Sequence, residues 1–315
     1  PKARGAHSRD SRLMHGRCPR LAIINGFGMT LGDGIIGLTA LSAALSAGVL
    51  GRRRPLLVRK PLFGRGLVNA LYRAAAPFAD VTWLPYRARA RAPFETRVSM
   101  REFAFDPAFR GVAMIDFFLR RLGADPSAIA AAQKRNRWLA RAITPRPPPG
   151  LPQRYVLVCP RASIPLRTMP EAVHACILAD LLTLQELPVV TQGRPAAHAR
   201  LIYCPACRSL AELAGLVREA ALIVSTDTAM LHLADAWSVP TLAFFVTHDP
   251  EWRVRDYPFC TAVRLPARLP PALEFPRDDR DLARAAAAWR APGRDLGWLA
   301  PLLTAALRGT EGEPA

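Results

Sequence analysis

The stretch from Ala221 to Phe245, ALIVSTDTAMLHLADAWSVPTLAFF, restricts the fold of this chain more than any other. It reads as a buried strand, a polar turn, a helix with one polar face and a second buried strand. Met230, Ala234 and Trp237 follow the i, i+4, i+7 spacing of a core-facing helix stripe. A strand–helix–strand unit of this kind is typical of an α/β domain.

The polar turn inside this stretch predicts an anion site. Ser225, Thr226 and Asp227 fall where the helix is expected to begin, so backbone N–H groups and the positive end of the helix dipole face outward there. Thr228 and His232 are four residues apart and share a face. A lone histidine is commonly a core residue, but His232 lies roughly opposite the core stripe, which favours a functional role.

The strand–helix alternation occurs twice, on either side of a proline-rich segment at 144–152. Four prolines within five residues can continue neither a helix nor a sheet ladder, so this segment is interpreted as a linker. Two alternating halves predict two doubly wound domains with a cleft between them. Strands are expected at 21–25, 56–59, 81–84, 155–159, 188–191, 201–204, 221–224 and in the run ending at 245, and helices at 34–48, 66–76, 109–122, 126–142, 171–184, 209–219, 279–289 and 296–307.

The resulting division of the chain has five parts. A disordered segment at 1–20 precedes an N-terminal Rossmann-like domain at 21–143 and a linker at 144–153. A second Rossmann-like domain follows at 154–295, and 296–315 form a closing helix and tail. The uncharged run 34–51 has the minimum length of a membrane span, but its glycines and small polar residues favour a buried helix.

A glycine-rich loop at 26–34 follows the first expected strand. Its glycines do not match the dinucleotide fingerprint G-x-G-x-x-G, and the loop lacks the Gly-Lys-Ser/Thr of a P-loop. It does place Asp33 at the carboxyl edge of a strand, which is where ligands bind in open α/β sheets. Asp33 is therefore either a candidate functional carboxylate or an ordinary helix-cap residue.

The charge distribution narrows the choice of partners. The formal net charge is +18, carried almost entirely by arginines that are spread along the chain. No dense basic run with interleaved aromatic residues occurs, so a nucleic-acid partner is not expected. A diffuse positive field suits an anionic substrate or an anionic membrane surface.

The cysteines indicate reduced thiols rather than a disulfide framework. Cys204 and Cys207 form one C-x-x-C pair, but a zinc site needs a second pair of ligands and none is nearby. A redox motif stays possible at this position, without any other thioredoxin feature. Free thiols favour a cytoplasmic protein.

Three motifs, taken in order, resemble glycosyltransferase family 9, the ADP-heptose:lipopolysaccharide heptosyltransferases and their bacterial relatives. The first is LGDGIIGLT at 31–39, and the second is CPRAS at 159–163 with RTMP at 167–170. The third is STDTAMLH at 225–232, followed by Ala234, Pro240 and Phe245, and HDPEW at 248–252 extends it. Only the third motif is specific, although the similar layout spans roughly 21–307.

The resemblance implies a GT-B fold, with the acceptor held by the first domain and the donor by the second. It implies an inverting, metal-independent transfer of a sugar from a nucleotide-diphosphate donor such as ADP-heptose, with no cofactor, to a lipopolysaccharide-core or other surface glycan. By position, Asp33 would be the general base. The donor would be held by Arg167, Thr226, Asp227, Thr228, Ala229 and His232, and the acceptor by Arg59 and Lys60, a choice based only on their place in the first domain.

Two departures from the family pattern leave alternatives open. Arg167 stands where the family usually has lysine, and Ala229 stands where it has glycine. The alternatives are a sugar-nucleotide epimerase on the same fold and a degenerate, non-catalytic glycosyltransferase. For an active enzyme the sequence predicts a cytoplasmic location, with peripheral contact at the inner face of the membrane and a lipid-linked or glycan acceptor.

Overall fold

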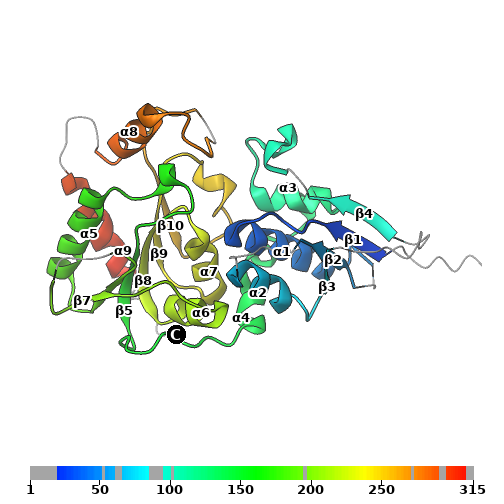
Figure 1. Ribbon diagram of the computed structural model, residues 1–315, viewed down its shortest axis with the longest axis horizontal. Helices are drawn as coiled ribbons and strands as arrows, with labels where there is room; N and C mark the ends of the chain where they lie inside the picture. The colour runs from blue at the N-terminus through cyan, green and yellow to red at the C-terminus, as the bar shows by residue number, and fades with distance from the viewer. Residues whose placement is uncertain are drawn as a thin grey trace, which may run out of the picture.

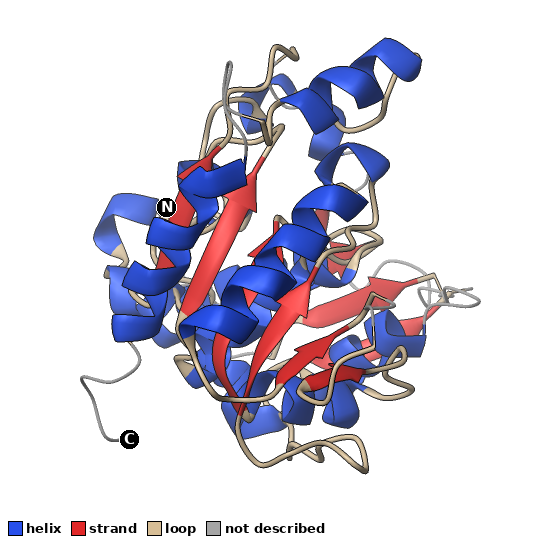
Figure 2. Cartoon of the chain, turned by 90° about the vertical axis from the view of Figure 1, so that its left-hand side faces the viewer, coloured by secondary structure: helices blue, strands red, loops and turns tan. Residues whose placement is uncertain are grey.

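The computed structural model describes residues 20–51, 54–60, 66–84, 95–100, 103–193, 197–270, 273–290 and 296–309. These residues form two lobes, each built around a parallel sheet with helices packed against it (Figures 1 and 2). The expected α/β class with two doubly wound domains is confirmed. The expected disordered segment falls almost entirely on residues outside this description.

The N-terminal sheet has the order β3-β2-β1-β4, with all strands parallel. Its strands are β1 (Arg20–Ile24), β2 (Leu56–Arg59), β3 (Asp80–Trp83) and β4 (Glu95–Ser99). The accompanying helices are α1 (Leu31–Ser46), α2 (Gly66–Ala74) and α3 (Met114–Arg121). The strand order changes direction between β1 and β4. At such a switch point the loops diverge to opposite faces and leave a crevice at the carboxyl ends of the strands.

The C-terminal sheet has the order β10-β9-β8-β5-β6-β7 and is also parallel. Its switch point lies between β5 (Tyr155–Cys159) and β8 (Ala220–Thr226). The other strands are β6 (Val189–Thr191), β7 (Leu201–Tyr203), β9 (Thr241–Phe245) and β10 (Cys260–Arg264), and the helices are α5 (Glu171–Leu184), α6 (Leu210–Arg218), α7 (Ala229–Trp237), α8 (Asp279–Ala287) and α9 (Leu299–Arg308).

The structure corrects the expected helix at 126–142. Only Arg137–Ala142 is α-helical there (α4), and short 3-10 turns at Pro126–Ala128 and Ala131–Lys134 precede it. Asp125 caps the first turn, and Ile129 after it is extended, so the helix cannot propagate through this point. Two strands, β4 and β10, were not expected, because both are sheet edges with polar or exposed residues.

Helix starts are set by capping residues that the hydrophobic pattern does not show. Thr30 caps α1 by accepting from the Asp33 N–H at 3.2 Å, so the helix begins three residues before the expected start. Thr228 caps α7 in the same way, so Ser225 and Thr226 belong to β8 rather than to the helix start. α1 is buried along most of its length, and no described helix is long and apolar enough to cross a membrane.

The two lobes share one apolar core. A buried cluster extends from Ile35 and Leu38 of α1, through Trp138 of α4, to Leu233 of α7. A separate cluster fills the other face of the C-terminal sheet under α5, α8 and α9. The proline-rich segment also packs closely: Pro147 lies so near Gly215 of α6 that a side chain there would meet its backbone. A large apolar interface of this kind restricts relative motion of the lobes.

A buried carboxylate on α7 ties the two lobes together. Asp235 is 4% exposed, and its carboxylate accepts from Arg135 Nε at 2.8 Å and from the Asn136 backbone N–H at 2.7 Å. Asn136 Nδ2 also donates to it at 3.0 Å, while Thr39 of α1 donates to Asn136 Oδ1 at 2.6 Å. Trp138 Nε1 donates to the same Thr39 hydroxyl. Helices α1, α4 and α7 are therefore joined through one hydrogen-bonded chain.

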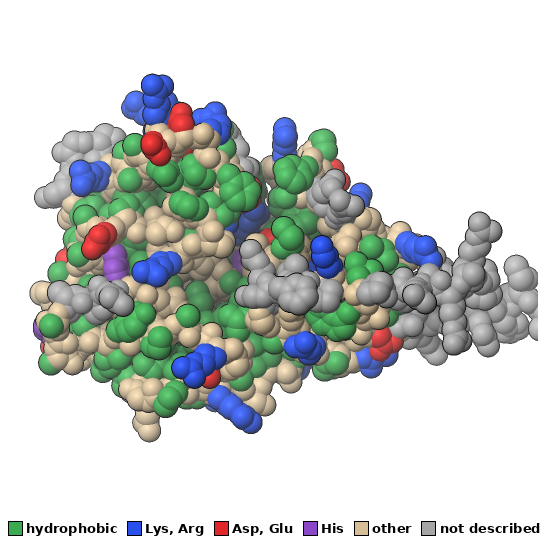
Figure 3. All heavy atoms as spheres, viewed as in Figure 1, with side chains coloured by type: hydrophobic (Ala, Val, Ile, Leu, Met, Phe, Trp, Pro, Cys, Tyr) green, Lys and Arg blue, Asp and Glu red, His purple; other side chains and the backbone are tan. Residues whose placement is uncertain are grey.

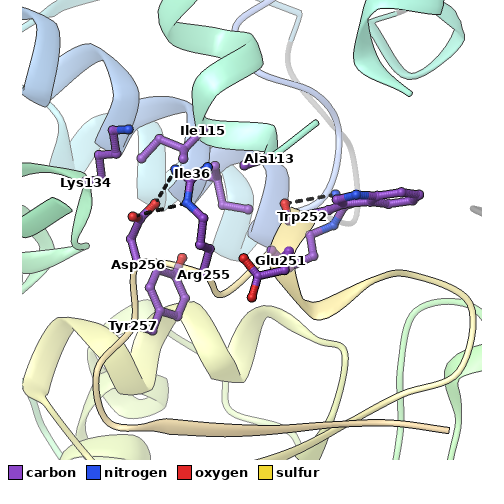
Figure 4. Close-up of a pocket in the computed structure, with 10 residues that line it drawn as sticks. Ile36, Ala113, Ile115, Lys134, Glu251, Trp252, Arg255, Asp256 and Tyr257 are labelled. Carbon is purple, nitrogen blue, oxygen red and sulfur yellow. Dashed lines mark hydrogen bonds and ion pairs between the residues drawn. The ribbon is translucent and has the colours of Figure 1, made fainter. Parts of the chain in front are cut away.

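A second, more exposed ionic contact joins the lobes beside a small cavity. Arg255 donates to Asp116 of α3 at 2.8 Å, and Lys134 donates to the same carboxylate at 3.0 Å. Figure 4 shows Lys134, Arg255 and Asp256 along this cavity, with Tyr257 next to them. The segment that follows β9 thus contacts α3 directly, and it is linked to the turn before α4 through the shared Asp116 carboxylate.

Removing the Asp235 carboxylate should destabilise the whole molecule. We expect Asp235→Ala to lower the free energy of unfolding by about 3–5 kcal/mol, because it leaves the buried Arg135 guanidinium without its counter-charge. Equilibrium unfolding in urea measures this. Replacing Arg135 by Met together with Asp235→Ala should cost less than the single change, and equal losses in the two variants would contradict the role of the pair.

Candidate active site

The loop after β1 carries Asp33 and is tightly folded. Gly28 has φ +99°, and a Cβ at this position would lie 2.9 Å from the Asp33 side chain. A side chain here would therefore displace the carboxylate, and only glycine combines this conformation with such close approach. The loop holds Asp33 in the first turn of α1, at the switch point of the N-terminal sheet.

Arg59 supports this loop from below. It is 2% exposed, and its Nη1 donates to the backbone oxygens of Asn25 at 3.1 Å and Gly28 at 2.7 Å. Its guanidinium lies 3.8 Å from the ring centroid of Tyr72, whose hydroxyl accepts from the Phe27 N–H at 2.8 Å. The Arg59 side chain is thus buried under the loop and supports its backbone, and its expected contact with an acceptor stays a prediction. Lys60 is exposed.

Asp33 lies in a partly desolvated, charged environment. Burial raises the pKa of its carboxyl above the ordinary value of 3.8, and Glu274 adds to the rise. The Thr30 hydroxyl and the guanidinium groups of Arg253 and Arg167 act in the opposite direction. Since Arg253, Arg167 and Glu274 come from the C-terminal lobe, Asp33 faces that lobe across the cleft.

At the switch point of the C-terminal sheet, Arg167 and Asp227 form a buried ion pair. Arg167, in the loop after β5, donates to Asp227 Oδ2 at 2.9 Å. His248 lies between two carboxylates, with Nδ1 3.3 Å from Asp227 and Nε2 3.0 Å from Glu274. Burial alone would raise the pKa of Asp227, but Arg167 and His248 outweigh it and hold this pKa well below the usual range.

Unpaired polar atoms accompany this ion pair. Within the part of the chain that the structure describes, the Thr226 hydroxyl and Arg167 Nε are buried without a hydrogen-bond partner. Both lie where β8 and the loop after β5 end. Arg59 Nε under the loop after β1 and Trp289 Nε1 in the core are unpaired in the same way, so the two atoms at the ion pair are free to accept or donate a hydrogen bond but do not by themselves mark a ligand site.

The first turns of α1 and α7 meet across the cleft. A Cβ at Gly32 would lie 3.3 Å from the His232 ring and 3.8 Å from Ala229 Cα. His232 is 3% exposed, and burial lowers its pKa to about 4, so its imidazole is neutral at pH 7. Thr228 Oγ1 accepts from the Met230 N–H at 3.2 Å. Two helix N-termini, each the positive end of a dipole, therefore converge on one place.

Seven of the nine predicted site residues come together at this cleft, namely Asp33, Arg167, Thr226, Asp227, Thr228, Ala229 and His232. Arg59 lies under the loop that borders the cleft, and no described contact joins Lys60 to the cleft. In the space-filling view a notch separates the upper parts of the two lobes, with basic side chains in its depth (Figure 3). Arg253 and Glu274 are the members that sequence reasoning missed. Glu274 stands alone in a proline-rich stretch, where no motif marks it.

The cysteines and possible metal ligands lie elsewhere. The five described cysteines form no disulfide with one another, and Cys18 is outside the described residues. Cys204 and Cys207 interact through their side chains in the segment between β7 and α6. In the described ranges no group of three or more His, Cys, Asp or Glu side chains is arranged to hold a metal ion.

The family model described as glycosyltransferase family 9 (heptosyltransferase) matches residues 79–257, which is more than half of the chain. The chain belongs to glycosyltransferase family 9. It is thus an enzyme of the glycosyltransferase class, and the resemblance seen in its motifs is confirmed. No curated protein sequence matches the chain closely enough to count as a relative.

Solved structures show the same fold at low identity. TibC, an iron-containing dodecameric glycosyltransferase from enterotoxigenic E. coli H10407, has a TM-score of 0.63 at 15% identity, over 94% of this chain and 80% of its own. E. coli ADP-heptose lipopolysaccharide heptosyltransferase II has a TM-score of 0.57 at 13% identity, over 93% of this chain and 100% of its own. E. coli heptosyltransferase WaaC with ADP reaches 0.50 at 15% identity, over 78% and 93%. The GT-B fold of this family 9 enzyme is therefore shown.

Replacement of Arg59 should act on stability rather than on a surface contact. We expect Arg59→Met to lower the free energy of unfolding by about 2 kcal/mol, because the Asn25 and Gly28 carbonyls lose their buried donor. Urea unfolding measures the change. Lys60→Ala, on the adjacent exposed residue, should stay within about 0.5 kcal/mol of the unaltered protein. An unchanged stability in Arg59→Met would show that the loop does not depend on this side chain.

Proposed function

We propose that this enzyme transfers a sugar, heptose or a close relative, from a nucleotide-diphosphate donor to a glycan hydroxyl, with inversion at the anomeric carbon. The single observation that carries the proposal is the meeting of Asp33 with the α7 N-terminus and Arg167 across one cleft. A proton acceptor and an anion site are the two parts that such a reaction needs.

Asp33 is suited to act as the general base. Inverting transfer is a single displacement, in which the acceptor oxygen bonds to the anomeric carbon as the bond to the leaving diphosphate breaks. The acceptor proton passes to a carboxylate on the attacking side. A pKa raised by burial makes the ionised Asp33 carboxylate a better proton acceptor than an exposed aspartate.

The C-terminal lobe is suited to stabilise the leaving diphosphate. Charge accumulates on the diphosphate oxygens as the glycosidic bond breaks, and preorganised donors lower that barrier. The α7 N-terminus at Thr228 and Ala229 and the Arg167 guanidinium supply such donors without a metal ion. Arg167 Nε and the Thr226 hydroxyl have no protein partner among the described residues and could hydrogen-bond to a ligand here. Asp227 contributes by orienting Arg167.

Ala229 does not need to be glycine for backbone reasons. Its φ is not in the left-handed region, so the methyl group adds only bulk at the first turn of α7. We therefore favour an active transferase over a degenerate homologue. WaaC was solved with ADP and TibC with ADP-D-β-D-heptose, which supports an ADP-sugar donor here. We propose a lipopolysaccharide-core or other surface glycan acceptor, reached from the cytoplasm at the inner membrane face.

Removing the general base Asp33 should stop sugar transfer but leave binding of the nucleotide donor intact. We expect Asp33→Asn to lower kcat by roughly 10²–10⁴-fold, because the amide cannot accept the acceptor proton. Transfer assays with ADP-heptose and calorimetric titration with ADP measure the two properties. In the unaltered enzyme, kcat/KM should fall as the pH drops through the pKa of Asp33. Burial raises this pKa above its ordinary value of 3.8. Full activity of Asp33→Asn would remove Asp33 from the mechanism.

Arg167 should take the place that a metal ion fills in other transferases. We expect Arg167→Gln to weaken ADP binding roughly 10–100-fold, which corresponds to the loss of a charge-assisted hydrogen bond. Arg167→Lys keeps the charge opposite Asp227 and should retain part of the affinity. Excess EDTA should leave the rate of the unaltered enzyme unchanged. Loss of activity on chelation, restored by a divalent cation, would contradict a metal-independent reaction.

A further inference from the structure

The His232 ring makes one strong contact, and it is with a tyrosine. His232 Nδ1 lies 2.8 Å from the Tyr257 hydroxyl, and the two rings meet edge to face at 5.7 Å. Both residues are buried, at 3% and 7% exposure. Tyr257 follows Arg255 and Asp256 on the segment that crosses to the N-terminal lobe (Figure 4). The contact therefore lies between the α7 first turn and the surface that joins the lobes.

The other nitrogen of the ring faces the cleft. A Cβ at Gly32 would lie 3.4 Å from His232 Nε2, so this atom lies against the first turn of α1, one residue from Asp33. Among the described residues no protein group hydrogen-bonds to it. The ring is neutral at pH 7, so it carries one N–H, and the partner at Nδ1 decides which nitrogen bears it.

The network around Tyr257 decides this assignment. Asn136 has a fixed orientation, because its Oδ1 accepts from Thr39 and its Nδ2 donates to Asp235. Asn136 is therefore not available to take the phenol proton. Burial, together with the nearby Asp235 carboxylate, raises the pKa of Tyr257 well above its usual value. The phenol thus keeps its proton. Among the described residues, the hydrogen-bond partner of the Tyr257 hydroxyl is His232 Nδ1, at 2.8 Å. A buried O–H is rarely left unpaired, so the phenol donates to Nδ1 and the ring N–H is at Nε2.

We propose that Tyr257 is a positioning residue, which fixes His232 in the Nε2–H tautomer and so presents a neutral N–H donor to a diphosphate oxygen of the sugar donor. The inference rests on the proposed function for the identity of the ligand, but not for the tautomer. A neutral hydrogen-bond donor suits the diphosphate site, because Arg167 and Arg253 already supply positive charge there. The His232 Nε2–H group would also add a contact on the side of the diphosphate that faces α1.

The tautomer can be tested on the ligand-free protein. In a sample labelled with ¹⁵N-histidine, long-range ¹H–¹⁵N correlation spectra distinguish Nε2–H from Nδ1–H, and His232→Gln identifies the His232 signals. We expect Nε2–H in the unaltered protein and a mixture of tautomers in Tyr257→Phe, which keeps the ring but loses the hydroxyl. A predominant Nδ1–H form in the unaltered protein would overturn the proposal, whatever the protein catalyses.

The role in binding is tested with ADP, and with adenosine, which lacks the diphosphate. We expect Tyr257→Phe to weaken ADP binding roughly tenfold and to leave adenosine binding unchanged. The matched control is Tyr155→Phe, since Tyr155 is also buried and donates to the Leu216 oxygen at 2.7 Å, at the opposite end of the sheet. Its ADP affinity should not change. Equal losses for ADP and adenosine would show a merely structural role for Tyr257.

A second variant separates positioning from packing. Glutamine at position 232 carries an amide N–H near the place of Nε2 and needs no tautomer to be selected. In the His232→Gln background, Tyr257→Phe should therefore have little further effect on ADP affinity. A further tenfold loss would contradict the proposal. If the unaltered protein binds no ADP although the Nε2–H tautomer is found, the assigned ligand and the proposed function fail, while the tautomer assignment stands.

Discussion

The buried carboxylate of Asp235 is the interaction on which the geometry of the site depends. It lies near the end of α7 and is held by Arg135 and Asn136, and Asn136 also accepts a hydrogen bond from Thr39 of α1. An ionised group at this depth is costly unless it is fully hydrogen-bonded, so the surrounding side chains have little freedom. As a result, the first turns of α1 and α7, which carry Asp33 and His232, are held in a fixed relation.

This arrangement produces a site with balanced charge before any ligand arrives. The dipoles of two helices and the side chains of Arg167 and Arg253 make the cleft positive, while Asp33, Asp227 and Glu274 oppose them. Without the carboxylates, the arginines would repel one another and adopt other positions. The carboxylates therefore keep the cations oriented, so little reorganisation is needed when an anionic ligand enters.

The sequence predicted the interior strands of both sheets well, but it missed two of the four edge strands, β4 and β10. Continuous apolar runs such as β5 and β8 are recognisable because both faces of these strands are buried. By contrast, β4 and β10 lie at sheet edges, where packing imposes no pattern. Motif positions located Asp33 and Arg167, but the burial of Arg59 could not be predicted, because it depends on Tyr72 and a loop that are distant in sequence. Glu274 could not be found, since only the tertiary fold brings it to His248.

The placement of Arg135 and Asn136 also limits how this enzyme could be recombined with its relatives. The proline-rich segment looks like a natural junction for exchanging one lobe, since it lies between two complete sheets. A chimera joined there would keep both sheets, yet the incoming N-terminal half would have to bring its own partners for Asp235. Exchange of acceptor specificity by lobe swapping is therefore restricted to N-terminal halves that carry residues equivalent to Arg135 and Asn136 before α4. A junction placed before residue 126 would instead keep Arg135 and Asn136 with Asp235 in the same half.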